Sequence, residues 1–237
     1  MQDREKGWLV MRTISIRTFA IGAIAVLTFA ANTSAQTASP VLNSLQVQKL
    51  VASSEPVDNA RLAAHFTALA DRYTADAKRH TAMAQGFAGN PTRSLGTGMA
   101  AHCKRLADLS TESAATVRGL AAYHQKLAGG VASTPPRDGA RFEGGAGASQ
   151  PTDQELKALA AKASTPADHK NLEEYFVTLA KRYTADANEH VAMAQAYRGT
   201  KIAQSATHCD RLVTLSRDAA KEATAAASMH RQLANVG

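Results

Sequence analysis

The chain has 237 residues, with 27 Lys+Arg and 20 Asp+Glu, and a formal net charge of +7. These charges are scattered along the sequence and form no basic stripe with interleaved aromatic residues, so a nucleic-acid partner is not expected. Alanine dominates the apolar residues and aromatic residues make up only 5%. This composition favours close-packed helices over a sheet core, and we expect an all-α protein.

The first 35 residues have the pattern of an export signal. Arg12 and Arg17 precede an apolar run over residues 19–31, and small residues follow it, with a predicted cleavage before Gln36. The apolar run is shorter than the roughly 20 residues that a membrane-spanning helix needs. The sequence therefore predicts a periplasmic or secreted protein with no stable membrane insertion after cleavage. An uncleaved anchor is the alternative.

The rest of the chain contains the same segment twice. Residues 56–88 and 166–198 share 17 identities in 33 positions at an offset of 110, and residues 102–128 and 208–234 share 11 in 27 at an offset of 106. The change of offset falls at one point, which indicates a turn between two helices. We therefore predict one helical hairpin repeat in residues 36–128 and another in 151–237. Residues 129–150, rich in Gly and Pro, are predicted to form a flexible linker.

Helix-start signals mark the first long helix of each repeat. Ser54 to Asp58 and Ser164 to Asp168 each place a polar residue before a first-turn Pro, with Asp two residues after it. Apolar stretches at residues 42–52 and 155–163 predict a short helix before each hairpin.

The strongest periodic signal is an apolar seam with alternating spacings of four and three residues. Seams of this kind pack antiparallel helices along their length. Two tandem hairpins then form, most simply, an elongated four-helix bundle, although separate hairpins, or hairpins that pair between chains, are alternatives. The seam residues are Leu62, Phe66, Leu69, Tyr73, Asp76, His80, Met83 and Phe87, and in the second repeat Leu172, Phe176, Leu179, Tyr183, Asp186, His190, Met193 and Tyr197.

Each seam contains polar residues that need a partner when buried. Folding each hairpin is expected to bring its seam His and Met close to a His-Cys pair at the start of the second helix. Imidazole, thioether and thiolate suit soft or borderline metal ions, with copper first and zinc or nickel behind it. The predicted metal ligands are His80, Met83, His102 and Cys103 in the first repeat, and His190, Met193, His208 and Cys209 in the second.

Two structural interpretations compete with the metal site. Asp76 can accept a hydrogen bond from His80 one turn away, so that the pair specifies the helix register. Cys103 and Cys209 occupy equivalent positions in an exported chain and can form a disulfide if both turns lie at one end of the bundle. The linker allows either orientation, so the sequence leaves this open.

No catalytic signature is present, since the sequence contains no repeated Glu-x-x-His, phosphate loop, nucleophile elbow or CxxCH. We therefore expect an exported, non-enzymatic helical bundle. Its first hypothetical function is binding of a soft metal ion as a store, buffer or sensor. Its second is a scaffold, structural or bound to another exported protein, in which the polar seam sets the helix register.

Overall fold

A computed structural model describes residues 41–53, 55–90, 93–130 and 151–236, and every regular element in them is a helix. The predicted export signal and most of the linker lie outside the described residues. No helix in the described part of the chain combines the length and the apolar character that crossing a membrane requires.

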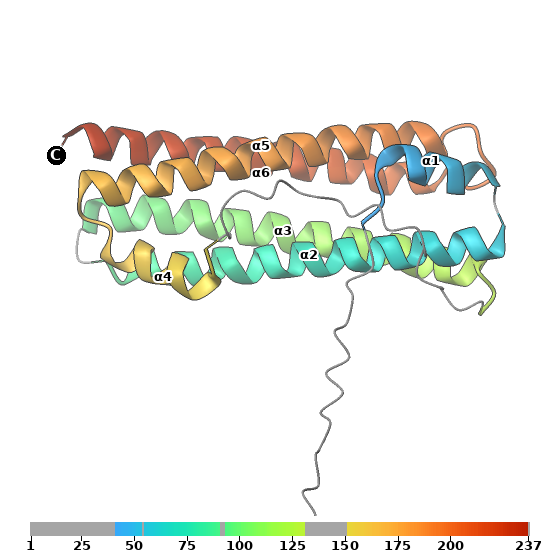
Figure 1. The fold of residues 1–237 in the computed structure, drawn as a ribbon, viewed down its shortest axis with the longest axis horizontal. Helices are drawn as coiled ribbons and strands as arrows, with labels where there is room; N and C mark the ends of the chain where they lie inside the picture. Colours follow the sequence, from blue (N-terminus) through green and yellow to red (C-terminus); the bar gives the residue numbers. More distant parts are fainter. Residues whose placement is uncertain (1–40, 54, 91–92, 131–150, 237) are drawn as a thin grey trace, which may run out of the picture. The chain divides into compact units, whose positions relative to one another are not determined.

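Four long helices form the bundle, and a short helix precedes each pair of them (Figure 1). The long helices are α2 (Pro56–Ala88), α3 (Arg93–Leu127), α5 (Pro166–Tyr197) and α6 (Ser205–Val236). The short helices are α1 (Ser44–Ser53) and α4 (Asp153–Lys162). The all-α prediction and the two short helices are confirmed.

The predicted start signals coincide with helix starts in both repeats. Helix α2 begins at Pro56 and α5 at Pro166, each with an Asp in the first turn. At α5 the Thr165 hydroxyl accepts a hydrogen bond from the Asp168 backbone N–H, and the Asp168 carboxylate accepts one from the Thr165 backbone N–H. This reciprocal capping satisfies two donors that a helix start otherwise leaves unpaired.

Helices α2 and α5 run in opposite directions, as do α3 and α6. Arg72 contacts Asp186 and Asp76 contacts Arg182, so residue numbers increase along α2 in the direction in which they decrease along α5. The turn between α2 and α3 therefore lies at the opposite end of the bundle from the turn between α5 and α6 (Figure 1). The two repeats are related by an approximate twofold axis through the middle of the bundle.

Each short helix packs near one end of the long helices. Helix α4 lies so close to α2 that a Cβ atom at Gly86 would be 2.5 Å from the Lys157 carbonyl oxygen. Only glycine allows this approach. The Asn90 side-chain amide also donates hydrogen bonds to the carbonyl oxygens of Ala160 and Ala163 in the α4 segment. At the other end, the Ser44 backbone N–H, at the start of α1, donates to the Glu189 carboxylate of α5.

The core consists of two apolar clusters, one toward each end. One cluster contains Met83, Cys103 and Tyr183, and the other contains Met193, Cys209 and Tyr73. A layer of buried polar side chains lies where the two clusters approach each other, between α2 and α5.

Candidate functional site

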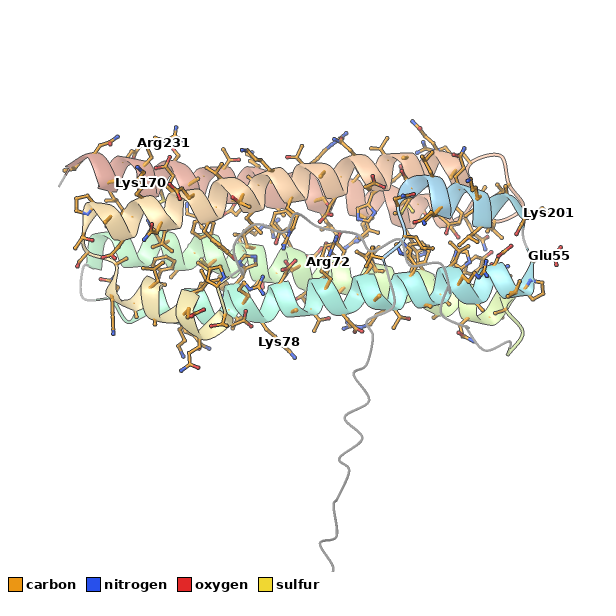
Figure 2. All side chains as sticks on the ribbon, in the orientation of Figure 1. Glu55, Arg72, Lys78, Lys170, Lys201 and Arg231 are labelled. Atoms are coloured by element: carbon orange, nitrogen blue, oxygen red, sulfur yellow. The ribbon has the colours of Figure 1, made fainter. Side chains whose placement is uncertain are left out.

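Two arginine–aspartate pairs cross from one hairpin to the other in this central layer. Arg72 Nη2 lies 2.8 Å from Asp186 Oδ1, and Arg182 Nη2 lies 2.6 Å from Asp76 Oδ2. The second pair repeats the first at the offset of 110. The Asp76 side chain is only 4% exposed, so its charge depends on the Arg182 guanidinium and on Arg79 Nη1 at 3.6 Å. Figure 2 shows Arg72 near the middle of the bundle.

Two tyrosine–histidine pairs lie beside the ion pairs and follow the same symmetry. Tyr73 Oη is 2.8 Å from His190 Nε2, and Tyr183 Oη is 3.1 Å from His80 Nε2. Each tyrosine ring also packs under the arginine that precedes it, with the guanidinium carbon 5.3 Å from the Tyr73 centroid and 5.0 Å from the Tyr183 centroid. The four pairs together form what we call the central polar layer: Arg72, Tyr73, Asp76, His80, Arg182, Tyr183, Asp186 and His190.

Burial controls the protonation of this layer. It lowers the pKa of both His80 and His190 to about 3, with nearby arginines adding to the effect, so both rings are neutral at neutral pH. Burial raises the pKa of Tyr183 to about 12, and that of Asp186 above its ordinary value. The Nδ1 atoms of both histidines have no hydrogen-bond partner within the described residues.

A further buried histidine lies toward each end of the bundle. At one end the His124 ring makes two hydrogen bonds of 2.8 Å: its Nδ1–H donates to Asn59 Oδ1, and its Nε2 accepts from the Tyr197 hydroxyl. At the other end His230 occupies the equivalent position, with its Nδ1 atom 3.2 Å from His169 Nδ1. Both His124 and His230 are 0% exposed.

The aromatic residue beside the buried histidine differs between the two ends. Phe87 is the repeat equivalent of Tyr197, and its ring lies 5.6 Å from the His230 ring, close to the 5.7 Å between His124 and Tyr197. His230 Nε2 has no partner in the described part of the chain. Phe87→Tyr is expected to supply that hydrogen bond and to raise the free energy of unfolding by about 1 kcal/mol, measured by urea denaturation. Tyr197→Phe, the matched control, is expected to lower it by about 1–3 kcal/mol. A destabilising Phe87→Tyr would contradict the equivalence.

The eight predicted metal ligands are distributed over different surroundings. His80 and His190 face tyrosines of the opposite hairpin, Met83 and Cys103 lie in one apolar cluster, and Met193 and Cys209 lie in the other. His102 contacts α6 and His208 is exposed. Within the described ranges, no three His, Cys, Asp or Glu side chains are grouped so that they could hold a metal ion. Met83 and Cys103 share a cluster, but the His80 ring contacts Tyr183 of α5 whereas His102 contacts α6, so the two histidines have different neighbours.

The two cysteines are free and buried. The disulfide between Cys103 and Cys209 that the sequence allowed is therefore not formed. Its condition was that both turns lie at one end, whereas the antiparallel hairpins place the turns, and the cysteines next to them, at opposite ends (Figure 1). Burial raises the pKa of each thiol to about 12, which keeps both protonated.

Sequence reasoning identified Asp76 and His80 as buried seam residues in need of partners, but it assigned the wrong partner. Asp76 pairs with Arg182 and His80 with Tyr183. The signal was present in the repeated segment Arg-Tyr-Thr-Ala-Asp-Ala, because two antiparallel copies place the Arg of each against the Asp of the other. Comparison with protein-family models, with curated proteins and with solved structures gave no match for the chain.

Proposed function

We propose that this protein is an exported, non-enzymatic helical scaffold whose central polar layer fixes the relative orientation of its two hairpins. Export is supported by Arg12, Arg17 and the apolar run that follows them. Amino-terminal sequencing of the protein recovered outside the cytoplasm tests this part. It is expected to start at or next to Gln36, and a chain that starts at Met1 would contradict it.

The observation that carries the scaffold proposal is the charge arrangement of the central polar layer. In the antiparallel orientation each Arg meets an Asp. If the hairpins were parallel, the repeat symmetry would place Arg72 against Arg182 and Asp76 against Asp186. Like charges side by side are unfavourable, most of all for Asp76 and Asp186, whose side chains are 4% and 12% exposed, so the layer penalises the alternative orientation as well as stabilising the observed one.

Apolar packing alone would not make this distinction. Both hairpins present similar apolar seams, and two such surfaces pack in more than one orientation. A buried polar group that is satisfied in only one arrangement selects that arrangement at some cost in stability. A scaffold benefits from this selection because a partner, which we propose to be another exported protein, then meets a fixed surface.

Distances between spin labels test the orientation directly. Figure 2 places Glu55 and Lys201 at one end of the bundle and Lys170 at the other. Labels at Glu55→Cys and Lys201→Cys are therefore expected to give one short distance, and labels at Glu55→Cys and Lys170→Cys one long distance of roughly 45 Å, the length of a 30-residue helix.

The variant for this test removes both the tyrosine–histidine pairs and the arginine–aspartate pairs of the central polar layer. An apolar layer is left when the two tyrosines are replaced by Phe and the other six residues by Leu: Tyr73→Phe, Tyr183→Phe, Arg72→Leu, Asp76→Leu, His80→Leu, Arg182→Leu, Asp186→Leu and His190→Leu. This variant is expected to remain helical but to show both the short and the long distance for each label pair. A single unchanged distance would mean that the polar layer does not set the orientation. Circular dichroism confirms that the comparison is between folded proteins.

Binding of a soft metal ion is the second candidate function. A specific contact favours it, because the Nε2 atom of His102 lies 3.1 Å from the thioether sulfur of Met229.

A further inference from the structure

Outside the central polar layer, His102 of α3 lies between two side chains of α6. Its Nδ1 atom is 2.6 Å from Glu222 Oε1, and its Nε2 atom is 3.1 Å from the thioether sulfur of Met229. The His102 and Glu222 side chains are 23% and 25% exposed, so the group is accessible from solvent.

When the His102 imidazole is neutral, two lone pairs face each other in this group. A carboxylate only accepts hydrogen bonds, so the neutral imidazole places its single proton on Nδ1, where it donates to Glu222. The Nε2 atom then carries a lone pair, and the thioether of Met229 has no proton to offer it. A second proton on the ring, or a cation between Nε2 and sulfur, would make this contact favourable.

We propose that His102 Nε2 and Met229 Sδ bind one soft cation, Cu(I), with Glu222 as the residue that orients the imidazole. Imidazole and thioether are ligands that suit copper, and a carboxylate on the far ring nitrogen is the usual support of a metal-bound histidine. Bonds as long as those at zinc sites, about 2.0 Å to nitrogen and about 2.3 Å to sulfur, can both reach one ion across the observed 3.1 Å. This site is independent of the scaffold role.

The symmetry-related group, around His208 of α6, has a different composition. The equivalents of Glu222 and Met229 are Thr116 and Tyr123, and the Tyr123 hydroxyl accepts a hydrogen bond from Gln204 at 2.8 Å. The equivalent of Gln204 is Gly98, where a Cβ atom would be 2.8 Å from the Met229 methyl carbon. The absence of a side chain at Gly98 thus leaves room for Met229 beside His102, and the part of the chain that the structure describes has one such site.

The test uses the exported chain, labelled with ¹³C at its methionine methyl groups and titrated with Ag(I), a d10 ion that substitutes for Cu(I) and is stable in air. Only the Met229 methyl resonance is expected to shift, and the shift should saturate at one ion per chain. Cu(I) affinity is then measured by competition with a chromogenic Cu(I) chelator. His102→Ala and Met229→Leu are each expected to weaken binding at least tenfold, and Glu222→Gln about tenfold, as is usual for a residue that supports a ligand.

His208→Ala is the matched control, because His208 occupies the equivalent position without the thioether or the carboxylate, and it is expected to leave the affinity unchanged. Met229→Leu preserves the size of the side chain and guards against loss of folding, which circular dichroism checks. Unchanged affinity in His102→Ala and Met229→Leu, or a Met99 or Met83 methyl that shifts instead of Met229, would overturn the proposal. The orientation measured by spin labels is unaffected by either result.

Discussion

Acidification from pH 7.5 to about pH 4.5 is expected to unfold the bundle. The reason is a set of five buried histidines whose pKa is lowered mainly by burial, to about 4 for His124 and to about 3 for the others: His65, His80, His124, His190 and His230. These rings are neutral when the protein is folded, because charging them inside the core is unfavourable.

The sign of the effect follows from the two states. Below the ordinary histidine pKa of about 6.5 the unfolded chain takes up protons, whereas the folded chain does not until about pH 3–4. Stability is therefore fully present above pH 6.5 and falls as the pH falls toward the folded values. Each such histidine contributes about 1.4 kcal/mol per pH unit in this range, and a small protein has only about 5–15 kcal/mol in total. Asp186, whose pKa is raised, acts in the opposite direction but is a single group.

Urea denaturation followed by circular dichroism at several pH values between 8.5 and 4.5 measures this dependence. The free energy of unfolding is expected to be nearly constant above pH 7 and to fall with a slope that corresponds to several protons below pH 6.5. In the variant with His80→Leu and His190→Leu the slope should decrease by about two protons, since leucine cannot titrate. A free energy of unfolding that stays constant from pH 7.5 to pH 5 would contradict the prediction.

The sequence was sufficient to predict the helices because their signals are local. The four-three spacing of seam residues such as Leu62 and Phe66, and the Pro-Asp starts at Pro56 and Pro166, depend only on neighbours within a few residues. The two short helices also began within two residues of the predicted positions. Internal repetition then made the second hairpin predictable from the first.

The orientation of the hairpins could not be predicted in the same way. It depends on side chains more than 100 residues apart, Arg72 with Asp186 and Asp76 with Arg182, joined through a linker that permits either direction. Without the orientation, Cys103 and Cys209 could be placed at one end. The pairing of His80 with His102 failed for a different reason, because Tyr183 of the other hairpin contacts His80. Sequence periodicity shows which face of a helix is buried, but it does not show which neighbouring helix covers that face.

Arg182→Leu is expected to lower the free energy of unfolding by about 3–5 kcal/mol, because it leaves the Asp76 carboxylate buried without its main partner. Arg72→Leu removes the equivalent partner of Asp186, which is 12% exposed. The two aspartates have different surroundings. Asp76 has a second arginine, Arg79, at 3.6 Å, whereas the repeat equivalent of Arg79 on the Asp186 side is Glu189. Burial already raises the pKa of Asp186, so this carboxyl can respond to the loss of Arg72 by taking up a proton.

The surface pair of Arg198 and Asp210 provides the control for this prediction. Its atoms are 2.7 Å apart, as close as in the buried pairs, but the side chains are 56% and 49% exposed. Arg198→Leu is expected to cost less than about 1 kcal/mol, because solvent hydrates the remaining carboxylate. Thermal and urea denaturation at pH 7.5, where the histidines are neutral in both states, compare the variants.

The double variant Asp76→Leu with Arg182→Leu distinguishes the net stability that the ion pair contributes from the cost of leaving one buried charge without its partner. Removing both charges eliminates the uncompensated carboxylate, so the double variant is expected to recover most of the stability that Arg182→Leu loses. If it does, the ion pair contributes little net stability, and its role is the selection of the antiparallel orientation. A double variant as unstable as the single one would mean that the pair itself stabilises the bundle. An Arg182→Leu cost no larger than that of Arg198→Leu would show instead that Asp76 does not depend on Arg182.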